Sequence, residues 1–158
     1  MHFMFILNDL EVFRKYKMIK AEQILDLLLK NSIWVYNNST PNIKNINMGD
    51  KVLLYLAGER RRKFVGSMEI AGEITPIKFR GNTEEEQDLY SLFSLYSPIQ
   101  NVNEFDDPIY IKEILDDLDF IKNKYKYGMY LRHSIKAISE SDFETVIQYN
   151  KEKRVSKQ

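Results

Sequence analysis

The stretch MGDKVLLYLA, residues 48–57, decides the fold that we predict for this 158-residue chain. Its first three residues indicate a turn, and the run from Lys51 to Ala57 that follows is apolar at almost every position. Side chains of a strand point alternately to opposite faces, so a strand that is apolar throughout is buried on both faces. We therefore expect residues 51–57 to form the central strand of the core.

Three elements are expected on the N-terminal side of this strand. Residues 2–7 are mostly apolar and aromatic and precede an Asn-Asp pair, which predicts a first strand with a turn behind it. Apolar residues recur near helical spacing from Met18 to Lys30, so this segment is predicted to be an amphipathic helix. The sequence IWVY at 33–36 is rich in β-formers and predicts another strand, followed by a loop at 37–41.

A hairpin with a basic tip is expected on the C-terminal side. Gly58 and residues 59–63 connect the central strand to residues 64–74, whose two glycines indicate a bent or bulged strand of a closing barrel. Thr83 is followed three residues later by Glu86, which is capping-box spacing and predicts a short helix.

The remaining segments alternate between helix and strand signals. The acidic run at 84–88 is interpreted as the solvated first turn of that short helix, and residues 92–102 are β-rich. Residues 106–108, Asp-Asp-Pro, predict a turn that caps a further helix beginning at the proline. Ser139, with an aspartate three residues later, predicts the cap of a last helix.

This order of elements predicts an α+β fold, a small and partly closed β-barrel flanked by helices. Strands dominate the middle of the chain, and no regular βαβ alternation, internal repeat or Pro/Gly/Ser-rich linker divides it. We expect a single domain over residues 1–150 and a basic, frayed tail over residues 151–158.

Composition excludes several classes of site. The chain has no cysteine and two histidines, so disulfides and thiolate chemistry are excluded, and neither a metal nor another cofactor is expected. Its apolar runs are shorter than the roughly 20 residues of a membrane helix, and its start lacks the features of a signal peptide, so we expect a cytoplasmic protein. Lys plus Arg (23) equal Asp plus Glu (23), so any nucleic-acid site must be a local basic patch.

Three segments carry a resemblance to a known family: SIWVYNNSTPNI (32–43), INMGDKVLLYL (46–56) and LDDLDFIKNKYKYGMYLRHSIKAISESDFETVI (115–147). They are similar to the Trp-containing segment, the Gly-Asp-Lys strand and the C-terminal signature of EVE domains. The resemblance implies a PUA-like barrel, related to the ASCH and YTH domains, that reads a modified base in DNA or RNA. Similar domains are also the N-terminal specificity modules of Mcr-type restriction GTPases.

The resemblance also points to the aromatic residues of a base pocket, because an extruded base is held by stacking and by hydrogen bonds to its edge. Trp34 lies in the segment that resembles the family's pocket wall, and Tyr36 shares its face if the strand is regular. Tyr127 stands at the position of a second pocket aromatic, where many relatives have tryptophan. The alternatives are a core tryptophan at Trp34 and an ordinary core or surface tyrosine at Tyr127.

The loop after Trp34 supplies candidate groups for reading a base edge. Asn37, Ser39 and Thr40 carry hydrogen-bond donors and acceptors, although any polar turn would use the same residue types.

Two basic segments are candidates for binding phosphates, with a merely solvated surface as the alternative. The first is the hairpin tip, with Arg60, Arg61, Arg62 and Lys63. The second interleaves basic residues with tyrosines, as single-strand binders do, and its basic members are Lys122, Lys124, Lys126 and Arg132. His133, beside them, is interpreted as a structural histidine.

The leading hypothesis is a non-enzymatic reader that flips a methylated base of DNA or RNA between Trp34 and Tyr127. A second hypothesis is the DNA-specificity domain of a modification-dependent restriction system that acts with a GTPase or nuclease partner. A third, a nucleotide-processing enzyme, requires a nucleophile or acid-base constellation, and the sequence offers none, nor a Gly-rich phosphate loop.

Overall fold

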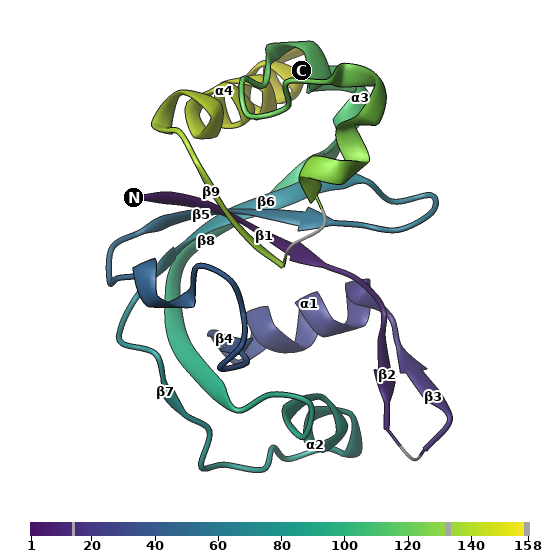
Figure 1. Ribbon diagram of the computed structural model, residues 1–158, viewed down its shortest axis with the longest axis vertical. Coiled ribbons are helices and arrows are strands. Elements are labelled where there is room, and N and C mark those ends of the chain that lie inside the picture. Colours follow the sequence, from purple (N-terminus) through teal and green to yellow (C-terminus); the bar gives the residue numbers. More distant parts are fainter. Residues whose placement is uncertain (14, 132–133, 157–158) are drawn as a thin grey trace.

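A strongly curved seven-stranded sheet forms the centre of the computed structural model, which describes residues 1–13, 15–131 and 134–156 (Figure 1). The strand order is β4-β8-β6-β5-β1-β9, with β7 pairing with β8. The strands are β1 (His2–Leu7), β4 (Ile33–Tyr36), β5 (Lys51–Leu56), β6 (Lys63–Ile70), β7 (Thr75–Pro76), β8 (Leu95–Tyr110) and β9 (Ile135–Ile138). Because the order begins at β4 and ends at β9, the sheet curls without closing, and the predicted α+β, partly closed barrel is confirmed.

Strand β5 has the central place that the sequence predicted. It runs parallel to β1, with Leu7 opposite Leu56, and antiparallel to β6. The β5 to β6 register shifts after Leu54, which is the bulge expected of the bent hairpin. Gly66 lies at a further shift, where a Cβ atom would come within 2.6 Å of the Asn103 carbonyl oxygen.

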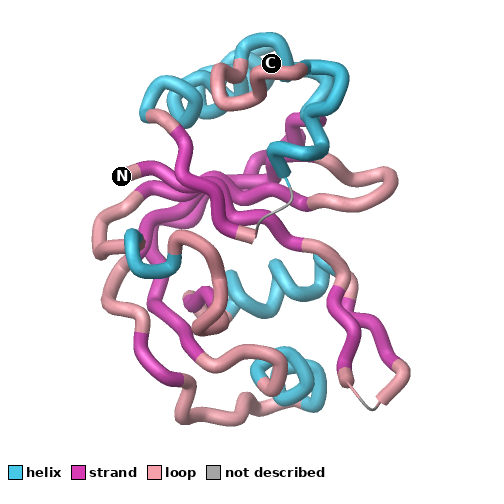
Figure 2. The backbone as a smooth tube through the Cα atoms, in the orientation of Figure 1, coloured by secondary structure: helices cyan, strands magenta, loops and turns pink. Residues whose placement is uncertain are grey.

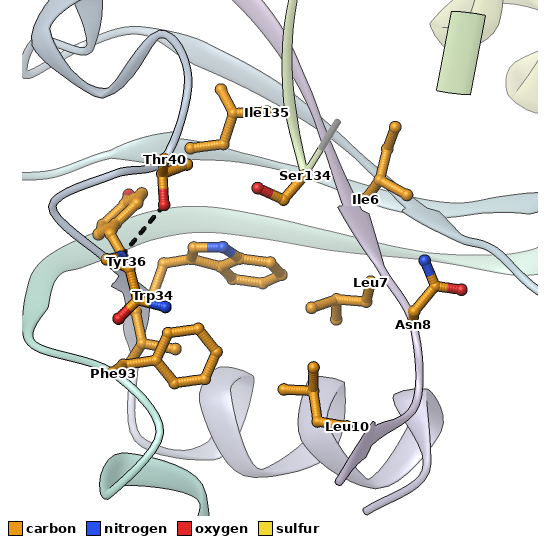
Figure 3. A pocket seen from close by; sticks show the side chains of 12 residues that line it. Ile6, Leu7, Asn8, Leu10, Trp34, Tyr36, Thr40, Phe93, Ser134 and Ile135 are labelled. Carbon is orange, nitrogen blue, oxygen red and sulfur yellow. Dashed lines mark hydrogen bonds between the residues drawn. The ribbon is translucent and has the colours of Figure 1, made fainter. Parts of the chain in front are cut away.

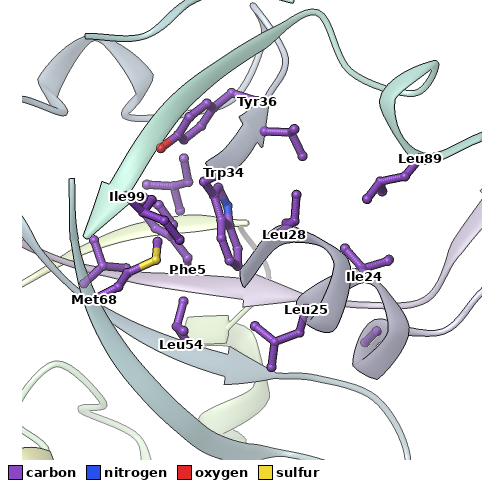
Figure 4. Close-up of a cluster of buried hydrophobic side chains, with 14 of the residues drawn as sticks. Phe5, Ile24, Leu25, Leu28, Trp34, Tyr36, Leu54, Met68, Leu89 and Ile99 are labelled. Atoms are coloured by element: carbon purple, nitrogen blue, oxygen red, sulfur yellow. The ribbon is translucent and has the colours of Figure 1, made fainter. Parts of the chain in front are cut away.

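Helices cover both faces of the sheet, and each face has its own apolar core (Figure 2). Helix α1 (Ala21–Lys30) lies against one face, with Phe5 and Trp34 from the sheet in the same core (Figure 4). Helices α3 (Ile111–Ile114) and α4 (Glu140–Ser156) lie against the other face.

Strand β8 is far longer than predicted, and the expected turn at 106–108 and helix start at Pro108 are wrong. The strand continues to Tyr110 because its last residues pair with β6, as Ile109 does with Phe64. Proline lacks a backbone N–H, but Pro108 falls where the β6 to β8 register is interrupted, so no ladder bond is lost there. Helix α3 therefore begins only at Ile111, and a 3-10 turn at Leu115–Asp117 follows it.

A hairpin of β2 (Leu10–Val12) and β3 (Lys17–Ile19) was not predicted. The expected helix start at Met18 is wrong, since this residue pairs with Glu11 in the hairpin and α1 begins at Ala21. Likewise β6 ends at Ile70 rather than Ile74.

Both predicted helix caps are confirmed. The Glu86 N–H donates to Thr83 Oγ1 (3.1 Å) before α2 (Glu84–Tyr90), and the Asp142 N–H donates to Ser139 Oγ (3.0 Å) in α4. Helix α4 continues to Ser156, through most of the segment for which fraying was predicted.

The acidic run at 84–88 is not simply solvated. Glu86 and Asp88 are buried, and the Asp88 carboxylate pairs with Lys15 (2.6 Å) and Lys17 (3.1 Å). Over the described part of the chain, no helix is long and apolar enough to cross a membrane.

Candidate nucleic-acid interface

A pocket of about 280 Å³ opens beside β4, between the C-terminal end of β1 and the start of β9 (Figure 3). We call it the Trp34 pocket. It is lined by Ile6, Leu7, Asn8, Leu10, Trp34, Val35, Tyr36, Asn37, Thr40, Phe93, Ser134 and Ile135. The volume lies just below the roughly 300–1,000 Å³ typical of ligand sites, which suits one planar ring better than an extended ligand.

Trp34 belongs to both the core and the pocket. Its side chain is only 4% exposed, and its ring packs against Phe5 with 5.5 Å between centroids. The same indole lies along the pocket beside Phe93 and Leu7 (Figure 3). Trp34 is therefore a core residue, as one predicted alternative had it, and it also lines a pocket; its role in binding a base stays a prediction.

Tyr36 contributes an apolar wall rather than a free hydroxyl. Its side chain is fully buried, and its hydroxyl is hydrogen-bonded to Ser97 Oγ at 2.9 Å. Burial raises the pKa of Tyr36 well above its ordinary value, so the ring stays neutral.

The loop at 37–40 is held in a tight turn at the rim of the pocket. The Asn37 N–H donates to Thr40 Oγ1 (3.2 Å), and the Thr40 N–H donates back to the Asn37 carbonyl oxygen (3.0 Å). Asn42 ties the end of the loop to β9, because its side-chain amide donates to the Ile135 carbonyl oxygen (3.1 Å). Ser39, predicted to read a base edge with Asn37 and Thr40, is exposed and does not line the pocket.

Free polar groups face the Trp34 pocket. Within the described residues, the side chains of Asn8, Asn37 and Ser134 make no hydrogen bond, so their donors and acceptors are available to a ligand. The sequence analysis missed Asn8, Ser134 and Phe93. Ser134 lies in the family-like segment and Asn8 in the Asn-Asp pair after β1, but nothing in the local sequence singles out Phe93.

Tyr127 lies on the other side of the sheet, in a second pocket of about 330 Å³. This pocket, the Tyr55 pocket, is lined by Tyr55, Ala57, Gly58, Arg62, Tyr127, Gly128 and Leu131. The predicted sandwich of a base between Trp34 and Tyr127 is therefore wrong, because the two rings pack against the cores of opposite sheet faces.

The basic hairpin tip divides into a structural arginine and its exposed neighbours. The Arg61 guanidinium is bound by the carboxylates of Asp9 and Glu22, each at 2.7 Å, which ties the hairpin to the start of α1. Arg60 and Arg62 are exposed, and the Lys63 ammonium lies 5.5 Å from the centre of the Tyr110 ring. Arg61 is thus engaged by carboxylates and is poorly placed for the predicted phosphate contact.

Replacing Arg61 by glutamine is expected to reduce the loss of folding stability that accompanies a fall in pH. The hydrogen bond from Arg61 lowers the pKa of Glu22, while the Ala21 N–H and then Arg61 lower the pKa of Asp9. A lowered carboxyl pKa gives stability that is present above the unfolded-state pKa, about 4, and is lost as the pH falls through the folded-state value.

Urea unfolding midpoints of the wild type and Arg61→Gln should therefore differ at pH 7 and converge toward pH 3. Arg60→Gln, which removes a neighbouring exposed charge, is the matched control. A difference that stays constant across this range would contradict the ion-pair explanation.

The second basic segment contains a 3-10 stretch, Lys124–Leu131. Lys122 and Lys126 are exposed, whereas the Lys124 ammonium donates to the Leu118 carbonyl oxygen at 2.6 Å. Tyr125 is 99% exposed, so aromatic and basic groups do share this surface. The predicted contributions of Arg132 and His133 lie outside the described residues.

The described residues contain no cluster of three or more His, Asp and Glu side chains able to hold a metal ion. The described residues thus offer an aromatic pocket with free amide and hydroxyl groups, and exposed cations on the hairpin tip and on the second basic segment.

Comparisons with known proteins agree with this architecture. The model of the family described as "EVE domain" matches residues 18–149. A search of curated proteins found no match to this sequence.

Solved structures similar to the chain cover nearly all of it. The DUF55 domain of human thymocyte nuclear protein 1 has a TM-score of 0.61 at 19% identity, covering 95% of this chain and 98% of that one. The human THYN1 protein in complex with DNA containing 5-methylcytosine has a TM-score of 0.59 at 17% identity, covering 94% and 96%. The N-terminal domain of McrB from Staphylothermus marinus has a TM-score of 0.51 at 9% identity, covering 93% of each chain. At these identities the likeness shows a shared fold.

Proposed function

The chain belongs to the EVE domain family, and from this premise we propose that it binds DNA and recognises a modified base in the Trp34 pocket. Family membership also confirms the resemblance drawn from the three sequence segments and the PUA-like fold that it implied. A relative of the same fold was crystallised with DNA that contains 5-methylcytosine, which supports DNA as the polymer.

The Trp34 pocket is the observation that carries the proposal. It joins a flat aromatic wall to the free side chains of Asn8, Asn37 and Ser134 in a volume of about 280 Å³. A base inside a duplex cannot reach such a pocket, so recognition requires that the base be extruded or lie in a single strand. Stacking on Trp34 and Phe93 then supplies affinity, and hydrogen bonds to the edge of the base supply selectivity.

The phosphates of the strand are bound by exposed cations. Arg60 and Arg62 on the hairpin, and Lys122 and Lys126 on the second basic segment, are the exposed cations that serve this role. Since the whole chain carries no net charge, phosphate binding depends on these local groups.

The direct test is fluorescence-polarisation binding to matched short strands, single and duplex, DNA and RNA. The strands carry no modification, 5-methylcytosine, 5-hydroxymethylcytosine or N6-methyladenine, and are compared at two salt concentrations. One modified DNA strand is expected to bind at least about tenfold more tightly than its unmodified counterpart, a difference of about 1.4 kcal/mol. Equal affinities with a steep salt dependence would leave only a phosphate-binding surface.

Phe93→Ala is expected to weaken binding of the preferred modified strand about 5-fold to 150-fold, because stacking on an aromatic side chain is worth about 1–3 kcal/mol per base. Asn37→Ala is expected to reduce the preference for the modified base more than it reduces overall affinity, because it removes an edge contact. The Asn37 side chain makes no hydrogen bond within the described chain, so this variant should keep its melting temperature.

Tyr16→Ala removes a 99% exposed aromatic residue outside the pocket and is the matched control. If Phe93→Ala and Tyr16→Ala bind alike, the base does not stack in the Trp34 pocket.

A second candidate function is the DNA-specificity domain of a modification-dependent restriction system. The observation that favours it is the likeness to the N-terminal domain of McrB over 93% of both chains. Genes for a GTPase and a nuclease beside this one, together with cleavage of modified DNA that requires all three products, would support this function. Cleavage that is unchanged when this chain is omitted would exclude it.

A further inference from the structure

The Tyr55 pocket contains a buried hydroxyl with no protein partner. Tyr55 is 1% exposed, and its hydroxyl oxygen makes no hydrogen bond with any described residue. A buried polar group without a partner is disfavoured, so such groups are usually satisfied by a ligand or an ordered water. The Tyr55 hydroxyl therefore lacks a hydrogen-bond partner, which a bound ligand would supply.

The groups around this hydroxyl are hydrogen-bond donors. Tyr55 lines this pocket together with Tyr127 and Arg62, and both of these groups act electrostatically on its hydroxyl. Arg62 is exposed, and its Nη1 atom lies 3.5 Å from the Tyr127 hydroxyl, a long and weak contact. A ligand that binds both groups better can replace this contact.

The charge of the pocket favours an anion. Its described lining includes the Arg62 guanidinium and the hydroxyls of Tyr55 and Tyr127, but no carboxylate. Guanidinium and hydroxyl groups together bind oxyanions such as phosphate, where an arginine can donate two parallel hydrogen bonds.

The pocket lies at the same end of the sheet as the Trp34 pocket. Ala57, which lines the Tyr55 pocket, donates its N–H to the carbonyl oxygen of Leu7 (2.9 Å), which lines the Trp34 pocket. Between them, Asn8 and Gly58 share a third, open depression. A strand with one base in the Trp34 pocket would reach Tyr55 across this depression, whose lining pairs the carboxylates of Asp9, Glu22 and Glu59 with the cations Lys20, Arg60 and Arg61.

We propose that Tyr55, Arg62 and Tyr127 form a phosphate-binding site, which takes a backbone phosphate of the strand whose modified base occupies the Trp34 pocket. The assignment to a backbone phosphate rests on the proposed function, whereas the binding of a phosphate group as such does not. A free phosphate monoester has the same chemistry and is the other source that the experiment distinguishes.

The first experiment uses inorganic phosphate alone. Binding is followed by backbone amide chemical shifts of the full chain, with chloride at the same ionic strength as reference, for the wild type, Tyr55→Phe and Arg62→Gln. We expect saturable shifts at Gly58 and Gly128 in the wild type and at least fivefold weaker phosphate affinity in both variants. Tyr55→Phe keeps the ring contact with Phe64 (5.1 Å between centroids) and removes only the unpartnered hydroxyl, so it should fold.

Two controls test whether the effect is local. Arg80→Gln removes an exposed charge outside the pocket, and Tyr16→Phe removes an exposed phenol. Both should bind phosphate as the wild type does. Equal affinity in the wild type, Tyr55→Phe and Arg62→Gln, or no saturable shift at all, would overturn the site.

The second experiment identifies the source of the phosphate. Single methylphosphonate linkages, which remove one negative charge, are placed in turn on either side of the modified base. One neutral linkage should weaken wild-type binding at least fivefold but weaken binding by Tyr55→Phe and Arg62→Gln less than twofold.

The outcomes separate this site from the reader function. If the neutral linkage weakens binding equally in the wild type, Tyr55→Phe and Arg62→Gln, the assignment to a backbone phosphate is wrong. The titration with inorganic phosphate tests the site independently of that result. Phosphate binding by a protein that does not distinguish modified strands would support the site and count against the base-reading function.

Discussion

Trp34→Ala is expected to lower the free energy of unfolding by about 3–5 kcal/mol and to abolish binding of the modified strand at the same time. The indole is 4% exposed and packs on Phe5 within the core beneath α1, so its removal leaves a cavity that the sheet cannot fill. Domains of this kind are stable by only about 5–15 kcal/mol, so the loss is a large part of the total. Urea unfolding followed by circular dichroism measures it.

Binding to Trp34→Ala therefore does not isolate the pocket, and Trp34→Phe is the informative partner. Phenylalanine keeps an aromatic face and most of the packing against Phe5, so it should cost less stability and retain part of the affinity. If Trp34→Ala unfolds within about 1 kcal/mol of the wild type, the core role of the indole is wrong. If Trp34→Phe and Trp34→Ala bind equally poorly while Trp34→Phe is stable, the pocket requires the indole itself.

The elements that the sequence predicts well are those whose signals are local. Residues 52–56 are apolar on both faces and can lie only where two cores meet, as β5 does. The side chains of Thr83 and Ser139 bond to amides three residues away, so their caps needed no knowledge of the rest of the chain.

The predictions that failed concern segments whose structure is set by pairing with another strand. Residues 106–108 have the composition of a turn, yet β6 extends the strand past them. Met18 precedes a run of apolar residues at helical spacing, yet it pairs across the hairpin with Glu11. Local propensity is a weak prior in such places, and tertiary pairing overrides it.

The predicted site residues differ in the same way, according to whether their positions depend on local sequence or on the fold. Trp34, Tyr36, Asn37 and Thr40 lie within seven consecutive residues, and all four line one pocket. Tyr127 comes from a segment about 90 residues away, and its side of the sheet is set by packing that no local pattern encodes. The resemblance identified the family, but the placement of that ring required the fold.

Asp142→Ala is expected to lower the free energy of unfolding by about 3 kcal/mol or more and to weaken phosphate binding at the Tyr55 pocket. The carboxylate is 2% exposed and accepts hydrogen bonds from the backbone N–H groups of Asp119 (2.8 Å) and Phe120 (3.0 Å). Hydrogen bonds to a charged group are worth about 1.5–3 kcal/mol each, and alanine leaves both N–H groups without this partner.

These two bonds tie the turn at 119–120, which precedes the segment carrying Tyr127, to the first turn of α4, so the loss of stability and the loss of phosphate affinity should appear together. Asp142→Asn keeps one acceptor oxygen in the same place and should show about half of the destabilisation. Asp119→Ala removes a neighbouring exposed carboxylate but keeps its N–H, and should leave both properties unchanged. Chemical denaturation and phosphate titration of the three variants test the coupling. A destabilised Asp142→Ala that binds phosphate like the wild type would contradict the coupling between this turn and the Tyr55 pocket.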